Sequence, residues 1–168
     1  MTQSRQYKWI IRQSRLGTLT ASASTFLLLQ LSVLLVFTTH FSWTGVALCA
    51  GSYLIRMFAI TGFYHRYFSH RTYRMARVTQ FLAAFLGATA TQKGPMWWAS
   101  SHRKHHKESD TENDPHNSHE GFWHSHWLWF LYKETEPTDS ESISDLEKYP
   151  EIRMIDNYWV VPPVMLGV

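Results

Sequence analysis

A stretch of forty residues, 16–55, contains no lysine, arginine, aspartate or glutamate. As one helix it would be roughly 60 Å long at about 1.5 Å per residue. A bilayer core is only about 30 Å thick and takes about 20 residues per crossing. A polar break lies near the middle of the stretch, at residues 38–43. We therefore predict a hairpin of two membrane spans, residues 19–41 and 45–64, with Trp43 at the far interface.

The flanks of this hairpin predict its orientation. Residues 1–15 are basic and contain no acidic side chain, and residues 66–77 are again rich in arginine. Positive flanks face the cytoplasm, so we expect an integral, multi-pass membrane protein whose N-terminus is cytoplasmic. A secretory signal is the first alternative, but its apolar region is only about 7–15 residues long. A buried helical hairpin of a soluble protein is the second.

Nine of the ten histidines follow the hairpin. His102, His105 and His106 are spaced i, i+3 and i+4, so on a helix their imidazoles share one face. His65 and His70 form a second pair further upstream. Imidazole nitrogen is a ligand for iron, zinc, copper and nickel. Two such boxes predict a metal site rather than a histidine-rich surface loop.

The first pair does not fit an ordinary helix. His65 and His70 are five residues apart, which is about 140° of rotation on a straight α-helix. We expect the helix to break within this box, at the end of the second span. The alternative is that the two histidines are bound from different sides.

The rest of the chain predicts a helical cytoplasmic region, so the fold class is all-α. Residues 78–90 are apolar, but at about 13 residues they are too short for a comfortable crossing. We predict a cytoplasmic helix there, which keeps both boxes on one side of the bilayer, and the metal-binding region extends over residues 65–157. Residues 133–150 are predicted to be a solvated loop, with a capping box at Ser144 and Glu147 that starts a helix into Asn157. Residues 158–168 are apolar and predict the start of a third span.

Composition excludes two classes of site. The chain has a single cysteine, Cys49, so it forms no internal disulfide and a thiolate metal site is not expected. The net charge of +3 is small and dispersed, which does not indicate a nucleic-acid partner.

The order of the motifs resembles the membrane-bound fatty acid (acyl-CoA) desaturase family, in particular the stearoyl-CoA (Δ9) desaturases and their bacterial relatives. The resemblance covers residues 62–168. It is carried by several motifs in register: His65-x4-His70, His102-x2-His105-His106, Asp114-Pro115-His116-Asn117, Gly121-Phe122, Ser125-His126 and Ser144-Asp145-Leu146-Glu147.

The resemblance implies a four-span protein with two irons that uses O2 and two electrons to insert a cis double bond into a fatty acyl chain. The metal ligands that carry over are His65, His70, His102, His105 and His106. Electrons would come from a separate donor of the cytochrome b5 or ferredoxin type. The acyl chain would be carried by CoA, by acyl carrier protein or by a membrane lipid.

The resemblance also implies substrate contacts. Gln92 and Trp98 stand at the positions that shape the acyl tunnel. Lys93 and Lys133 stand at positions that contact the CoA part in animal enzymes. Lys133 keeps a basic residue there, but Lys93, Ser100, Ser101 and Glu134 depart from the pattern and leave the acyl carrier open. Outer-shell partners orient ligating imidazoles, and the candidates for that role are His116, Asn117 and His126.

Two other functions fit the same boxes, namely a histidine-box alkane or lipid hydroxylase and a non-enzymatic membrane metal-binding protein. The family resemblance further implies about nine ligating histidines, whereas the two boxes supply five. We therefore expect this chain to be the N-terminal part of a longer desaturase and to be inactive by itself.

Overall fold

The computed structural model describes residues 21–114, 116–129 and 138–166. All regular structure in these residues is helical, which confirms the predicted all-α class. The chain divides into two compact units, one of residues 1–41 and 110–136 and the other of residues 42–109 and 137–168. The elements in chain order are α2 (Ala21–Ser32), η1 (Val33–Thr38), α3 (Trp43–Phe58), η2 (Ala59–Ser69), α4 (Arg77–Ala88), α5 (Pro95–Glu108), η3 (Ser118–Glu120), η4 (His124–Leu128), α7 (Ser144–Glu147), α8 (Pro150–Asn157) and α9 (Val161–Met165).

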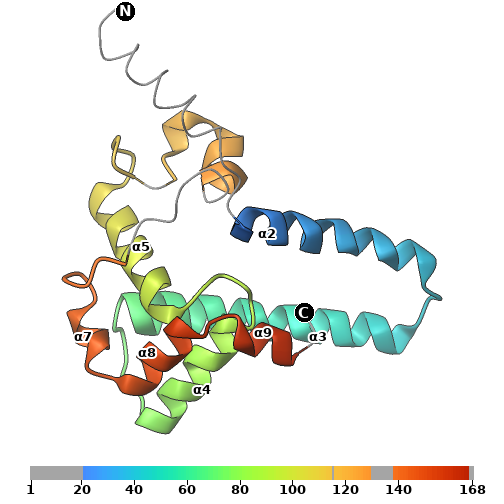
Figure 1. Cartoon of the computed structure of the whole chain (residues 1–168), viewed down its shortest axis with the longest axis horizontal. Coiled ribbons are helices and arrows are strands. Elements are labelled where there is room, and N and C mark those ends of the chain that lie inside the picture. Colours follow the sequence, from blue (N-terminus) through green and yellow to red (C-terminus); the bar gives the residue numbers. More distant parts are fainter. Residues whose placement is uncertain (1–20, 115, 130–137, 167–168) are drawn as a thin grey trace, which may run out of the picture. The chain divides into compact units, whose positions relative to one another are not determined.

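The longest helix of the second unit is formed by α3 and η2, which run on without a break (Figure 1). It begins at Ser42, whose hydroxyl accepts a hydrogen bond from the Gly45 backbone N–H at 3.3 Å, an N-cap contact. Trp43–Ser69 is the one helix among the described residues that is long and apolar enough to cross a membrane, and a shorter apolar helix covers Phe26–Thr38. The predicted spans 45–64 and 19–41 overlap these two helices, and their passage through a bilayer stays a prediction.

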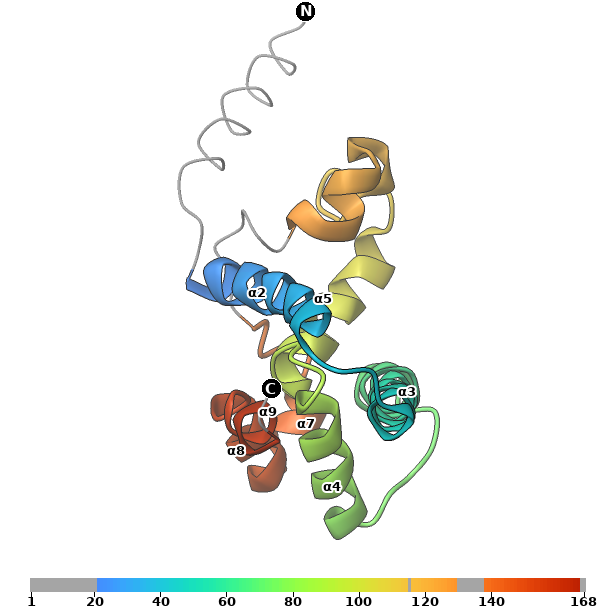
Figure 2. The ribbon, with the colours of Figure 1, turned by 90° about the vertical axis from the view of Figure 1, so that its right-hand side faces the viewer.

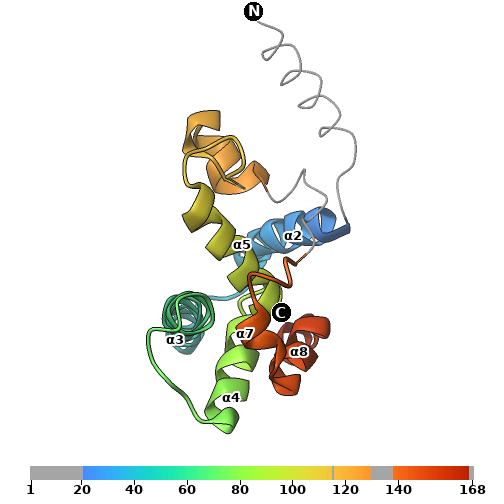
Figure 3. The same ribbon diagram turned by 90° about the vertical axis from the view of Figure 1, so that its left-hand side faces the viewer.

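The second half of this helix is partly buried, packed against α4 and α5. Two views along the long helix show α4 between it and α8 (Figures 2 and 3). Tyr64 and Phe68 are fully buried there. Gly87 of α4 comes so close to the Tyr64 ring that a Cβ atom at this glycine would lie 2.1 Å from a ring carbon. The predicted helix over residues 78–90 is therefore present as α4, packed side by side with the first histidine box.

The prediction of a solvated loop over residues 133–150 is wrong for residues 143–147. Ile143 and Leu146 are fully buried, and α7 starts directly after Ile143. The predicted capping box is also absent, because Ile143 and not Ser144 occupies the N-cap position, and no side chain caps this helix. Burial of the two apolar side chains fixes this segment more strongly than a surface cap. Residues 130–137 lie outside the described part of the chain.

The predicted helix into Asn157 is interrupted. After α7 a new helix, α8, begins with Pro150 in its first turn, where proline loses no hydrogen bond. Ile152 and Ile155 of α8 face the core shared with α4 and α5. Beyond α8, residues 161–165 form the short helix α9, and the start of a third span in residues 158–168 stays a prediction.

Candidate metal centre

The first histidine box lies on a π-helix. In η2 the His70 backbone N–H donates to the His65 carbonyl at 3.2 Å, a bond between residues i and i+5. This winding is wider than an α-helix and brings residue i+5 back over residue i. The helix ends at Ser69, inside the box as predicted, and its wide winding up to that point turns both imidazoles to the same side.

The second box lies on α5, which begins where the Gly94–Pro95 pair interrupts the preceding segment. His102 and His106 are one turn apart on this helix and face η2. The Nε2 atom of His102 lies 3.1 Å from that of His70 and 3.0 Å from that of His106. The Nε2 atoms of His65 and His70 are 3.2 Å apart.

These four imidazoles, His65, His70, His102 and His106, have ligand nitrogens that all lie within 4.8 Å of one another. An imidazole nitrogen binds a metal at about 2.0–2.1 Å, so neighbouring nitrogens of one coordination sphere are roughly 2.8–3.4 Å apart. The contacts of 3.0–3.2 Å fall within this range. The donor set thus fits a single metal ion held between η2 and α5.

The electrostatics of the cluster favour the metal-binding form of histidine. Burial, together with the neighbouring imidazoles, lowers the pKa of His102 to about 3. Burial and the charges of His65, His106 and Arg103 also lower the pKa of His70. A lowered pKa keeps the imidazole neutral, and the neutral ring is the one that coordinates a metal.

His105 is placed differently from the other four predicted ligands. Its ring centroid lies 6.3 Å from that of His102 and 5.7 Å from that of His106. It follows His102 by three residues on α5, beside the converging set but outside it. The structure therefore brings together four of the five predicted ligands and leaves His105 on the flank of the cluster.

Two predicted substrate residues contact each other next to the cluster. Trp98 stacks on His102 with ring centroids 4.7 Å apart and planes at 23°. Its indole N–H donates to the Gln92 side-chain oxygen at 3.1 Å. Trp98 lies one helical turn before His102, so the same face of α5 presents a wide apolar ring and then the imidazoles.

The predicted CoA contacts are only partly described. Lys93 precedes α5 with a backbone φ of 66°, and its ammonium nitrogen lies 4.0 Å from the centroid of the Trp97 ring. Burial lowers the pKa of Lys93 to about 8. Lys133 lies outside the described residues.

The three outer-shell candidates belong to the other unit. The His126 ring stacks on Phe122 at 5.2 Å, and the His116 ring lies 5.2 Å from that of Trp129. The Asn117 side chain accepts a hydrogen bond from the His119 backbone N–H at 2.9 Å and caps η3. Their outer-shell role stays a prediction.

Comparison with known proteins gives a consistent group of relatives. The chain is 33% identical over 133 residues to a palmitoyl-monogalactosyldiacylglycerol delta-7 desaturase of Arabidopsis thaliana, covering 77% of this chain and 36% of that protein. It is 32% identical over 146 residues to an sn-1 stearoyl-lipid 9-desaturase of Anabaena variabilis, covering 85% and 54%. It is 36% identical over 124 residues to an acyl-CoA 5-desaturase of Anemone leveillei, covering 71% and 39%. The chain belongs to the membrane fatty acid desaturase family.

No family model matches this desaturase chain. The chain spans between about a third and about half of the length of these relatives. The names of the relatives differ in bond position, with 5-, 7- and 9-desaturases, and in carrier, with acyl-CoA and acyl-lipid substrates. The names of the relatives therefore share one reaction class, desaturation, but do not agree on one substrate.

Sequence reasoning missed the side chains that hold the histidine helix α5 in place. Asp156 of α8 accepts hydrogen bonds from the backbone N–H groups of Met96 and Trp97, at 2.8 and 3.1 Å, and so caps α5. Burial raises the pKa of Asp156, against the effect of these two bonds. Arg103 and Asp145 form a second contact. Such partners lie about 40 to 60 residues apart in sequence, and local spacing gives no signal for them.

Proposed function

We propose that this protein is a membrane-bound di-iron fatty acyl desaturase that inserts a cis double bond, at Δ9, into an acyl chain. The observation that carries the proposal is the convergence of four imidazole nitrogens from two helices at metal-ligand spacing. The desaturase names of the relatives support it. The balance of the reaction is that two hydrogens leave adjacent acyl carbons while O2, two electrons and two protons become two water molecules.

The histidines of the two boxes would hold the metal ions. His65, His70, His102 and His106 would hold one iron, and His105, on the flank of the same helix, is positioned to face a second. Bound iron supplies the redox chemistry that no side-chain acid or base can perform on an unactivated CH2 group. The chain's own contribution is to fix the imidazoles and keep them neutral.

Trp98 and Gln92 would form the wall along which the acyl chain passes. The indole is held by its hydrogen bond to Gln92 and by its stacking on His102, so an apolar surface lies directly beside the proposed iron. The acyl carrier would be CoA, acyl carrier protein or a lipid. Lys93, Lys133 or both would meet an anionic carrier.

The long helix supports a membrane setting. The first half of this helix exposes large apolar side chains, including Leu48, Leu54 and Phe58 at 69%, 65% and 60%. Contiguous exposed apolar surface marks a membrane or a partner protein. We propose a multi-pass membrane protein with the histidine boxes in the cytoplasm and a separate electron donor. Labels at Ser4 and Ser140 should both be cytoplasmic and one at Ser42 should be on the far side, whereas opposite sides for Ser4 and Ser140 would contradict this topology.

The function is tested in a host that lacks its own desaturase. The natural full-length protein should carry about two irons per chain and add monounsaturated acids to the host profile, and His105→Ala should remove the activity. Hydroxy fatty acids in place of unsaturated ones would favour a lipid hydroxylase. Stoichiometric zinc from an iron-replete host, with no change in the profile, would favour a non-enzymatic metal-binding protein.

A further inference from the structure

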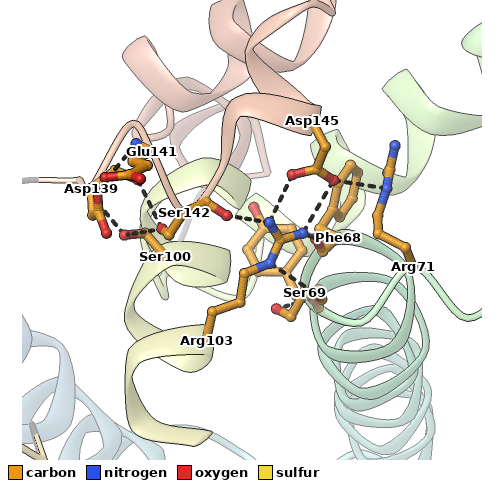
Figure 4. A network of polar contacts seen from close by, with 10 residues as sticks. Phe68, Ser69, Arg71, Ser100, Arg103, Asp139, Glu141, Ser142 and Asp145 are labelled. Carbon is orange, nitrogen blue, oxygen red and sulfur yellow. Dashed lines mark hydrogen bonds and ion pairs between the residues drawn. The ribbon is translucent and has the colours of Figure 1, made fainter. Parts of the chain in front are cut away.

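Arg103 lies directly after the ligand candidate His102, and its side chain enters a network of polar contacts between three helices, α5, η2 and α7 (Figure 4). Its Nε–H donates to the Ser69 carbonyl at 2.8 Å and its Nη2 to the Phe68 carbonyl at 2.9 Å. Both carbonyls belong to the last turn of η2, where a helix leaves carbonyl groups without intrahelical partners. Arg103 therefore ties the helix of the second box to the end of the helix of the first box.

The other side of the same guanidinium meets α7. Asp145 receives two hydrogen bonds from it, Nη1 to Oδ1 at 2.7 Å and Nη2 to Oδ2 at 3.2 Å, and Nη1 also donates to the Ser142 carbonyl. An arginine has five N–H donors, and all five are used in these contacts. Arg71, just past the first box, adds an ion pair to Asp145 at 3.1 Å.

The environment makes these contacts strong. The Arg103 side chain is 21% exposed and that of Asp145 is 34% exposed. Burial alone would raise the pKa of Asp145, but the hydrogen bond and charge of Arg103 and the charge of Arg71 outweigh it and lower the pKa. A charged, forked hydrogen bond of this kind fixes geometry as well as adding energy.

We propose that Arg103 is a positioning residue that sets the spacing between the two histidine boxes, with Asp145 holding its guanidinium in place. The inference rests on the proposed metal-centred function and adds a residue to it. The Nε2 atoms of His70 and His102 are 3.1 Å apart across the two helices, and a metal site tolerates only about 0.2 Å of error in its bond lengths. The contacts from Arg103 to the end of η2 are the polar link that fixes this gap.

Arg103→Gln and Arg103→Lys, in the natural full-length protein, test the proposal. Arg77→Gln is the matched control, because Arg77 also makes two hydrogen bonds to a carboxylate, that of Glu151, but links α4 to α8 and touches neither box. The first measurement is titration of the metal-free protein with Co2+. Arg103→Gln should weaken cobalt binding about 10- to 100-fold, the loss typical of partners that orient ligands, and Arg77→Gln should leave it unchanged.

The lysine variant separates charge from geometry. Lysine keeps the positive charge but has three donors in place of a five-donor fork, so Arg103→Lys should stay well below wild-type affinity. Full recovery by lysine would overturn the positioning role. If Arg103→Gln does not fold, Asp145→Asn decides in its place, since it keeps the shape but removes the charge that holds the guanidinium. Wild-type cobalt affinity in Asp145→Asn would overturn the proposal as well.

A second measurement does not depend on metal. Spin labels at the exposed positions 66 and 107, in a Cys49→Ser background, report the distance between η2 and α5 by double electron–electron resonance spectroscopy. The metal-free wild type and Arg77→Gln should give one narrow distance, and Arg103→Gln should give a broadened or shifted distribution. An unchanged distribution in Arg103→Gln would overturn the proposal. If the distribution changes in Arg103→Gln but the wild-type protein forms no unsaturated acids, the desaturase function is refuted and the spacing role stays intact.

Discussion

Residues 65–106 contain five histidines and residues 116–126 contain four, but the two groups lie on different backbone structures. In the first segment a π-helix and an α-helix lie side by side and aim four imidazole nitrogens at one point. In the second, short helices and turns carry the histidines, the His126 ring stacks on Phe122, and the His116 ring lies tilted against that of Trp129. The second segment has the higher histidine density, so density does not explain the converging cluster; the helix geometry that directs the rings does.

The largest expected effect comes from removing one ring of each group. His102→Ala should weaken metal binding by more than about 100-fold, beyond the loss typical of an outer-shell partner, because His102 lies at the centre of the cluster. For His126 we expect a packing role, against the outer-shell role predicted from the sequence, so His126→Phe, which keeps a ring against Phe122, should leave the affinity unchanged. Metal titration checks both. A 10- to 100-fold loss of metal affinity in His126→Phe would show that the second group orients the ligands of the first, and would contradict the distinction drawn between the two groups.

A second test concerns the packing that brings the first group together. In Gly87→Ala the new methyl group would meet the Tyr64 ring, and overpacking of this kind costs about 1–3 kcal/mol. Gly51→Ala is the control, because nothing lies within 4 Å of its Cβ position and alanine is favoured in a helix interior by about 1 kcal/mol. Thermal unfolding in detergent should show a lower melting temperature for Gly87→Ala and not for Gly51→Ala.

A smaller effect is expected at the aromatic side chain next to the first group. Trp98→Phe keeps a ring over His102 but removes the hydrogen bond to Gln92, which is worth about 1 kcal/mol or about a fivefold change. The expected result is a higher KM or a changed product pattern at unchanged iron content. Gln92→Ala should give the same result. Loss of iron in either variant would place this pair among the residues that hold the metal.

The smallest effect is the acid response of the Arg103–Asp145 contact. The pKa of Asp145 is lowered in the folded protein, so on acidification the unfolded chain takes up the proton first. The contribution of the pair is therefore complete above the ordinary aspartate pKa of about 3.9 and is lost as the pH falls through the lower folded value. The difference in melting temperature between wild type and Asp145→Asn should stay constant from pH 6 to about pH 4 and shrink at lower pH. A constant difference would contradict an ionised Asp145.

The sequence predicted the helical class, the helix that is present as α4, and the grouping of the two boxes. It did not predict how His65 and His70 meet, because helix periodicity assumes 3.6 residues per turn and a π-helix breaks that assumption. It also misjudged Ile143 and Leu146, which sit in an acidic, polar segment but are buried. Arg103 and Asp156 were missed for another reason. Their partners are distant in sequence, and one chain by itself does not reveal such pairs.

The cap that Asp156 provides for α5 has a consequence for how the protein is made. Met96 is joined to a partner sixty residues further along the chain. A ribosome adds roughly 5–20 residues per second, so the partner appears about 3–12 s later. During that interval the histidines of α5 have left the ribosome before the helix that caps them is available. We predict that nascent chains arrested before Asp156 retain less iron than chains arrested after it, and equal retention would contradict this order of events.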